Sequence, residues 1–229
     1  MVVKNTQFIP LLVSVIITLL SIENPVFWDN ITFISDMGNA LYGNGILNWI
    51  SITNQIDPGH PPFIAMLMAL SWKLVGKSLW ISHLVMLPFV YGLLFQLYNF
   101  VQHIVQHKRL SVFAFFMVLA DPTLLAQLVT LNPEVLLLFF FFLSLNAVLN
   151  HNKTLKVIGL VGLSLVSYRG MMLGVGVLLI DVLLHWFYHK RQLNTFLTNQ
   201  NILIYIISSI PAIAYIIWRL VMKGWLISN

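Results

Sequence analysis

Charged side chains are scarce in this chain, and cysteine is missing altogether. Only 8% of its 229 residues are Asp, Glu, Lys or Arg, whereas about 25% of the residues in a soluble domain are charged. Without cysteine, neither a disulfide framework nor a thiolate metal site can form. The sequence also lacks the signatures of phosphate-binding loops, zinc proteases, serine hydrolases and dinucleotide-binding turns. These absences exclude the enzyme classes that those motifs define.

Hydrophobic residues make up 59% of the chain, and the mean hydropathy is +0.88. This composition predicts an all-α integral membrane protein. The net charge of +5 is typical of basic loops that orient helices in a bilayer, so we expect no nucleic-acid partner. The first 22 residues lack a small-residue cleavage site, and we interpret them as a membrane helix rather than a signal peptide.

Seven apolar runs predict about seven transmembrane helices. An eighth run, residues 62–75, has 14 residues, whereas a spanning helix needs about 20. We therefore interpret it as a half-inserted helix of an outer loop. The seven expected spans cover residues 8–22, 78–103, 110–131, 133–149, 155–171, 173–188 and 202–222.

The distribution of charge orients these spans. With Lys4 inside, the inward segments collect seven Lys and Arg residues, Lys153 and Lys156 among them, and no acid. The outward segments hold five bases and six of the seven acids. Basic inward loops follow the positive-inside rule. We therefore expect a multi-pass plasma-membrane protein with a cytoplasmic N-terminus and a first outer loop over about residues 23–77.

A polar segment, residues 28–62, interrupts the hydrophobic sequence, and four of the seven acids of the chain lie between Glu23 and Asp57. Within it, apolar residues recur at helical spacing opposite a polar face that includes Asp29 and Asp36. This pattern predicts an amphipathic helix that lies on the membrane surface and ends at Gly43–Gly45. The apolar positions are Ile31, Ile34, Met37 or Gly38, and Leu41.

Two positions in the first outer loop are candidates for chemistry. Asp29 follows Trp28 just after the first span, where it could act as a general base or stabilise charge, or could simply cap a helix. His60 lies in Asp57-Pro-Gly-His-Pro-Pro62, and the prolines hold it rigidly at a helix start. It suits a phosphate contact, a metal contact or proton transfer, while the alternative is a turn histidine that faces water.

Further candidates lie at the outward ends of later spans. Glu134 follows Pro133 and either complements a helix dipole or converges with Asp29, in which case the two carboxylates could hold a divalent metal ion. Arg169, and with it Arg219 and Lys223, would suit a phosphate group or would snorkel at the interface. Asp181 lies within a span, so we expect it to face the helix bundle in a structural role.

These features together resemble a known family. A single span, an outer loop opening with aromatic-Asp at Trp28-Asp29, and Gly59-His-Pro-Pro62 leading an apolar helix that ends in Gly76 are similar to polytopic glycosyltransferases of the GT-C fold. The nearest branch is that of the protein mannosyltransferases and aminoarabinose transferases (glycosyltransferase family 39-like). The resemblance extends from Phe8 to about Ser144.

The resemblance implies roles for individual residues. Asp29 matches the catalytic aspartate of the first outer loop, although Asn30 stands where the protein mannosyltransferases have Glu. His60 matches the histidine near the donor phosphate, with Asp57 beside it. Glu134 matches the acid that begins the span after the second outer turn, and Arg169 corresponds more loosely to a basic residue that contacts the phosphate.

The family implies a single membrane module, residues 1–229, that transfers a sugar from a polyprenyl-phosphate sugar to a lipid, glycan or protein acceptor on the outer face, with either stereochemical course. Most relatives continue past this core, so we expect a minimal form or one that lacks the usual C-terminal region. Two alternatives remain from other classes, a small transporter or flippase subunit and a non-catalytic assembly protein. A transporter would need polar residues along several spans, and the span interiors here carry almost no charge.

Overall fold

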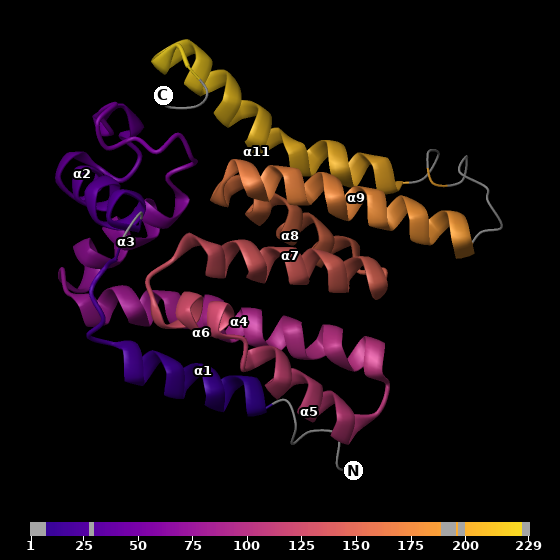
Figure 1. The fold of residues 1–229 in the computed structure, drawn as a ribbon. Helices are drawn as coiled ribbons and strands as arrows, with labels where there is room; N and C mark the ends of the chain where they lie inside the picture. The colour runs from indigo at the N-terminus through magenta and orange to yellow at the C-terminus, as the bar shows by residue number, and fades with distance from the viewer. Residues whose placement is uncertain (1–7, 28–29, 189–195, 197–199, 226–229) are drawn as a thin grey trace. The chain divides into compact units, whose positions relative to one another are not determined.

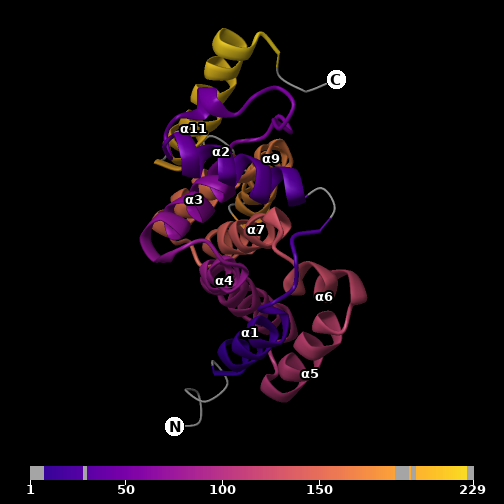
Figure 2. The same cartoon turned by 90° about the vertical axis from the view of Figure 1, so that its left-hand side faces the viewer.

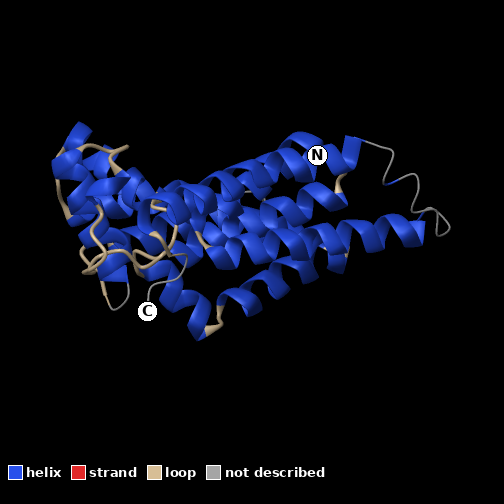
Figure 3. Cartoon of the chain, turned by 90° about the horizontal axis from the view of Figure 1, so that it is seen from above, coloured by secondary structure: helices blue, strands red, loops and turns tan. Residues whose placement is uncertain are grey.

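The computed structural model describes residues 8–27, 30–188, 196 and 200–225. The regular elements in these ranges are helices, and no strand occurs among them (Figure 3). The predicted all-α class is therefore confirmed. The chain divides into two units, residues 1–58 with 62–139 and residues 59–61 with 140–227, and each is described separately. The boundary between them falls inside one helix, α7.

The first unit begins with a short apolar helix and contains the segment predicted to be the outer loop, for which we keep that name, and a longer helix after it (Figure 1). Its elements are α1 (Phe8–Ser21), η2 (Ile31–Asp36), α2 (Met37–Asn44), η3 (Trp49–Ser51), α3 (Phe63–Val75), α4 (Leu79–Val105), α5 (Lys108–Leu119), α6 (Pro122–Val129) and the first half of α7 (Pro133–Leu149). The second unit contains the rest of α7, α8 (Lys153–Val166), α9 (Tyr168–Tyr188) and α11 (Gln200–Lys223).

Helix α1 packs against α4 and α6 in the first unit. Two hydrogen bonds fix the segment that follows α1: the Asn24 side-chain amide donates to the carbonyl of Val129 at 3.0 Å, and the Asn24 carbonyl lies 3.0 Å from Nε2 of His83. His83 is buried in α4. A backbone that leaves a helix needs partners for its polar groups, and these contacts supply them where the outer loop begins.

Residues 110–131 are not one straight span, contrary to the sequence prediction. Helices α5 and α6 meet at a bend of 73° (Figure 2). Pro122 lacks an N–H and disfavours helical geometry at the residue before it. Asp121 caps α6 by accepting a hydrogen bond from the Leu124 N–H at 2.9 Å. The sequence prediction missed this break at Asp121-Pro122 because the run is hydrophobic on both sides of it.

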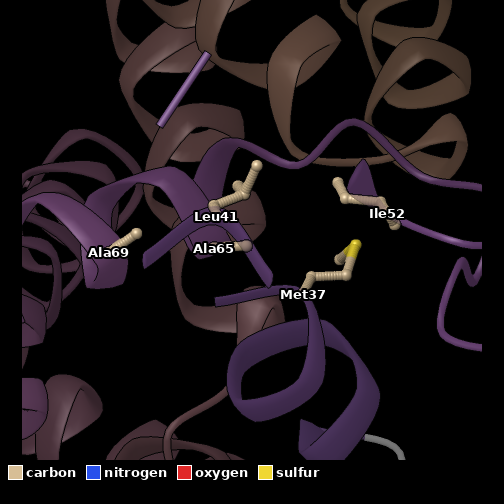
Figure 4. Packing of buried hydrophobic residues seen from close by; sticks show 5 residues of the cluster. All are labelled: Met37, Leu41, Ile52, Ala65 and Ala69. Atoms are coloured by element: carbon tan, nitrogen blue, oxygen red, sulfur yellow. The ribbon is translucent and has the colours of Figure 1, made fainter. Parts of the chain in front are cut away.

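The outer loop forms a small core of its own. Ile34, Met37 and Leu41 are fully buried, as the helical spacing predicted, whereas Ile31 is 46% exposed. Their helix packs its apolar face against α3 rather than presenting it outward (Figure 4), which differs from the surface-lying helix that the pattern predicted. The buried cluster, here called the outer-loop core, consists of Met37, Leu41, Ile52, Ala65 and Ala69.

In the second unit, α8 packs against both α9 and α11. The approach of α7 to α8 depends on glycine. A Cβ at Gly159 would meet the Ser144 side chain, its backbone nitrogen at 2.9 Å and the Phe140 carbonyl at 3.1 Å. A contact with backbone atoms cannot be relieved by turning a side chain. The two helices can therefore pack this closely only with glycine at position 159.

We expect Gly159→Ala to destabilise the protein by about 1–3 kcal/mol, because overpacking forces the backbones of α7 and α8 apart. The matched control is Gly176→Ala in α9, where nothing lies within 4 Å of an added Cβ. That control should be neutral or slightly stabilising, since alanine favours helix. Unfolding midpoints in one detergent measure both, and equal midpoints would contradict the close packing.

A buried ion pair joins helices within the second unit. Lys156 Nζ lies 2.6 Å from Asp181 Oδ2, and the Tyr205 hydroxyl donates to the same oxygen at 2.8 Å. Asp181 faces the bundle, as predicted. Lys156 is only 4% exposed, so its assignment as an inward loop cation was wrong. Lys156 and Asp181 can both be buried because the ion pair neutralises their charges.

Within the described residues, three helices are long and apolar enough to cross a membrane, Leu79–Val105, Tyr168–Phe187 and Ile202–Lys223. The bent pair of α5 and α6 would make a fourth. These helices support a multi-pass membrane protein. Helices α1, α3 and α7 are apolar but shorter, and α8 has 14 residues, so the structure supports three to four spans by length and composition.

The expected span over residues 155–171 ends earlier than predicted. Ser167 is extended, with φ −167° and ψ 168°, and its hydroxyl accepts a hydrogen bond from the Gly170 N–H at 3.2 Å. A serine in this position caps the next helix. Arg169 therefore lies in the first turn of α9 rather than in a free turn between spans.

Candidate functional site

The turn that carries His60 is held by residues far away in the sequence. Gly59 has φ +89°, a conformation that favours glycine. The Tyr215 hydroxyl of α11 donates to the Gly59 carbonyl at 3.3 Å, across 156 residues. The Tyr168 N–H of α9 donates to His60 Nδ1 at 3.5 Å, and the two rings lie 5.5 Å apart. A neutral His60 that accepts at Nδ1 carries its proton on Nε2.

Arg219 is the largest fully buried side chain near this turn, with 1% of its surface exposed. Its Nη1 donates to the Tyr215 hydroxyl at 3.0 Å, and that hydroxyl in turn donates to Gly59. The guanidinium faces the Trp225 ring at 4.1 Å and the Tyr215 ring at 5.8 Å. Aromatic faces attract a cation in this way, so the site holds a positive charge inside the protein.

Arg169 adds a second guanidinium next to Tyr168, whose ring lies 6.2 Å from that of Tyr215. Arg169 is exposed and lies at the start of α9. Position 170 requires glycine, because an added Cβ would clash with the Leu163 carbonyl. We call the side chains that these contacts join the basic–aromatic cluster: His60, Tyr168, Tyr215, Arg219 and Trp225. Arg169 follows Tyr168 in the sequence, and its side chain is exposed.

An apolar groove runs along the same faces of α9 and α11. It consists of two adjoining pockets of about 260 and 500 Å³ that share Leu178, Tyr205 and Ser209. Its α9 residues, Met171, Val175, Leu178 and Val182, continue the helical face that begins at Tyr168. Its α11 residues Tyr205, Ser209, Ala212 and Ile216 continue toward Arg219.

The cluster and the groove differ in the chemistry that each can accommodate. Guanidinium groups and an imidazole N–H recognise phosphate oxygens. The groove is lined mainly by aliphatic side chains with a few hydroxyls, which suits a hydrocarbon chain. The cluster thus suits an anionic group, and the groove suits an apolar chain.

The predicted site residues fall in different parts of the structure. His60 and Arg169 belong to the second unit, and Tyr168, which precedes Arg169 in the sequence, contacts His60. Asp57 and Glu134 belong to the first unit. Asp57 is buried, and the Glu134 N–H donates to Asn132 Oδ1 at 2.9 Å in the first turn of α7, which agrees with the helix-start interpretation. Asp29 lies outside the described residues.

No group of three or more His, Cys, Asp or Glu residues that could hold a metal ion occurs in the described part of the chain. This result does not test the predicted divalent-cation site of Asp29 and Glu134, because Asp29 lies outside the described residues. The buried Arg219 guanidinium carries a permanent positive charge, and a cationic group repels a metal ion. The basic–aromatic cluster therefore fits an anion.

Sequence reasoning missed the aromatic half of the site. Tyr168, Tyr215 and Trp225 each lie one to six residues from a basic residue at the end of an apolar helix. That proximity was the available signal, because aromatic side chains beside Arg or Lys can stack on the cation. It could not indicate that α9 and α11 would meet at the His60 turn.

Comparisons of the chain with protein-family models, with curated proteins and with solved structures found no match.

Proposed function

We propose that this protein is a membrane glycosyltransferase that moves a sugar from a polyprenyl-phosphate sugar to a lipid, glycan or protein acceptor on the outer face of the plasma membrane. The carrying observation is the basic–aromatic cluster at the end of the apolar groove. Such a donor has a phosphate head and an isoprenoid tail, the two chemistries that this arrangement accommodates. The resemblance of the outer-loop sequence to GT-C glycosyltransferases supports the same conclusion.

The reaction requires the protein mainly to position the reactants and to stabilise the charge that develops. The acceptor hydroxyl oxygen bonds to the anomeric carbon, the bond from that carbon to the phosphate oxygen breaks, and polyprenyl phosphate leaves with the electron pair. Asp29 takes the hydroxyl proton or supports the attack. Arg219, Arg169 and His60 stabilise the negative charge that grows on the leaving phosphate. A divalent ion held by Asp29 and Glu134 would screen charge at the same step.

The membrane arrangement belongs to this proposal. In the proposed topology of seven crossings with a cytoplasmic N-terminus, His60, Arg169 and Arg219 lie at outward ends, as do Asp57 and Glu134. In this arrangement α1, α7 and α8 are short spans, and the α5–α6 pair is one broken span. The first outer loop, with its juxtamembrane helices α2 and α3, then faces the outer surface.

Donor turnover tests the proposal against the transport alternative. The purified chain in nanodiscs is incubated with polyprenyl-phosphate sugars and candidate acceptors, and mass spectrometry follows released polyprenyl phosphate. A transferase breaks the sugar–phosphate bond, whereas a flippase returns the donor intact. Transbilayer movement of intact donor without cleavage would overturn the assignment, and so would an inert protein in the presence of a full acceptor panel.

We expect Arg219→Lys to raise the donor KM about tenfold, which corresponds to ~1.4 kcal/mol. Lysine keeps the charge but loses the planar fork and the stacking on Trp225 and Tyr215. Turnover at saturating donor should fall as well, because the guanidinium also stabilises the charge that grows on the leaving phosphate. The control is Arg109→Lys at the exposed start of α5, which should keep the wild-type KM. An unchanged KM in Arg219→Lys would remove Arg219 from the donor site.

A further inference from the structure

The outer loop presents two apolar side chains that the proposed function does not use. Leu47 is 79% exposed and Ile50 is 64% exposed. Their neighbours Ile46 and Trp49 turn the other way and pack against the outer-loop core. The segment 45–52 thus has an inner face held by the core and an outer face that protrudes. We call the protruding pair the 47/50 tip.

The backbone of this segment satisfies many of its own polar groups. The N–H groups of Asn48, Ser51 and Ile52 donate to carbonyls of the same segment at 3.0, 3.0 and 3.2 Å. The side chains of Asn48 and Ser51 also donate to nearby carbonyls, at 3.3 and 2.6 Å. A polar group that already has a partner costs much less to remove from water. The transfer of the tip from water into lipid therefore costs little free energy.

The surrounding sequence carries no charge. From Met37 to Ile56 there is no Asp, Glu, Lys, Arg or His. A charged residue on this segment would oppose entry into lipid, and none is present.

We propose that the 47/50 tip inserts into the interfacial layer of the lipid bilayer and anchors the outer loop there. Two observations favour the lipid bilayer as the partner of the tip. The chain has helices able to span a membrane, and two side chains are far too few for a protein interface, which buries about 800 Å² on each partner. This inference is independent of the proposed function, because it concerns only the outer-loop core and its tip.

The absence of native cysteine allows a direct test by single-cysteine labelling. Leu47→Cys and Ile50→Cys are labelled with an environment-sensitive fluorophore in the full chain, which is reconstituted in phosphatidylcholine–phosphatidylglycerol vesicles. The control is Asn54→Cys, an exposed polar position of the same loop. All three positions are exposed, so the fold of the outer-loop core should survive each change.

The expected result is blue-shifted emission at positions 47 and 50, with at least twofold stronger quenching by lipids that carry a nitroxide near the glycerol level than at position 54. Aqueous iodide should quench position 54 and spare the other two. Iodide quenching at 47 and 50 equal to that at 54 would overturn the proposal. Protection from both quenchers, or a disulfide between copies at 47, would also overturn it in favour of a protein contact.

Discussion

Asp29→Asn should lower sugar transfer by about 10²–10⁴-fold, the range that a positioned general base contributes. The amide keeps the size and much of the hydrogen bonding of the carboxylate, but it cannot accept the acceptor proton at neutral pH. The change is therefore expected to spare membrane insertion and folding. The measurement is the initial rate of label transfer from donor to acceptor, at equal amounts of folded protein.

Asp36→Asn provides the matched control for this carboxylate. Asp36 lies seven residues after Asp29 on the polar face predicted for this stretch, and it ends η2. We expect near wild-type transfer from Asp36→Asn. Wild-type turnover in Asp29→Asn would refute the assignment of Asp29, and equal losses in both variants would indicate a general effect of charge in the outer loop rather than a base.

Removal of one partner of the Lys156–Asp181 pair should have the largest effect on stability. We expect Lys156→Met to destabilise the protein by about 3–5 kcal/mol, because Asp181 would stay buried without its cation. The Tyr205 hydroxyl, at 2.8 Å, offsets only part of that loss. Lys153→Met, one turn earlier in α8 and exposed, should change stability little. Reversible unfolding in mixed detergent measures each variant.

The double variant Lys156→Met with Asp181→Leu separates charge from packing. If the uncompensated carboxylate is the cause, the double variant should recover most of the stability lost in Lys156→Met, because a buried pair can often be replaced by apolar residues of similar volume. A double variant as unstable as the sum of the two single changes would contradict the ion pair as the source of the effect.

Composition and periodicity predicted the helical elements well. The boundaries of α4, α7 and α11 agree with the apolar runs within a few residues, because membrane helices are defined by long apolar stretches. The burial of Ile34, Met37 and Leu41 followed from helical spacing. These features depend on interactions between residues close in sequence, which a single chain reveals directly.

Features that depend on distant contacts could not be predicted. The charge rule counted Lys156 as a loop cation because nothing local indicates that Asp181, 25 residues away, would pair with it. The anchoring of Gly59 by Tyr215 likewise joins segments 156 residues apart. The break before Pro122 was a local signal, but the hydrophobicity of the run outweighed it.

The most direct test of the proposed function is label transfer in membranes that contain this chain. Radiolabelled polyprenyl-phosphate sugars are supplied as a panel with extracted lipids as acceptors, for the 229-residue chain and for a form extended by any downstream coding sequence. We predict that label moves from one donor to an acceptor, and that it stops moving in Asp29→Asn. The absence of label transfer by both forms across the full panel would contradict the glycosyltransferase proposal.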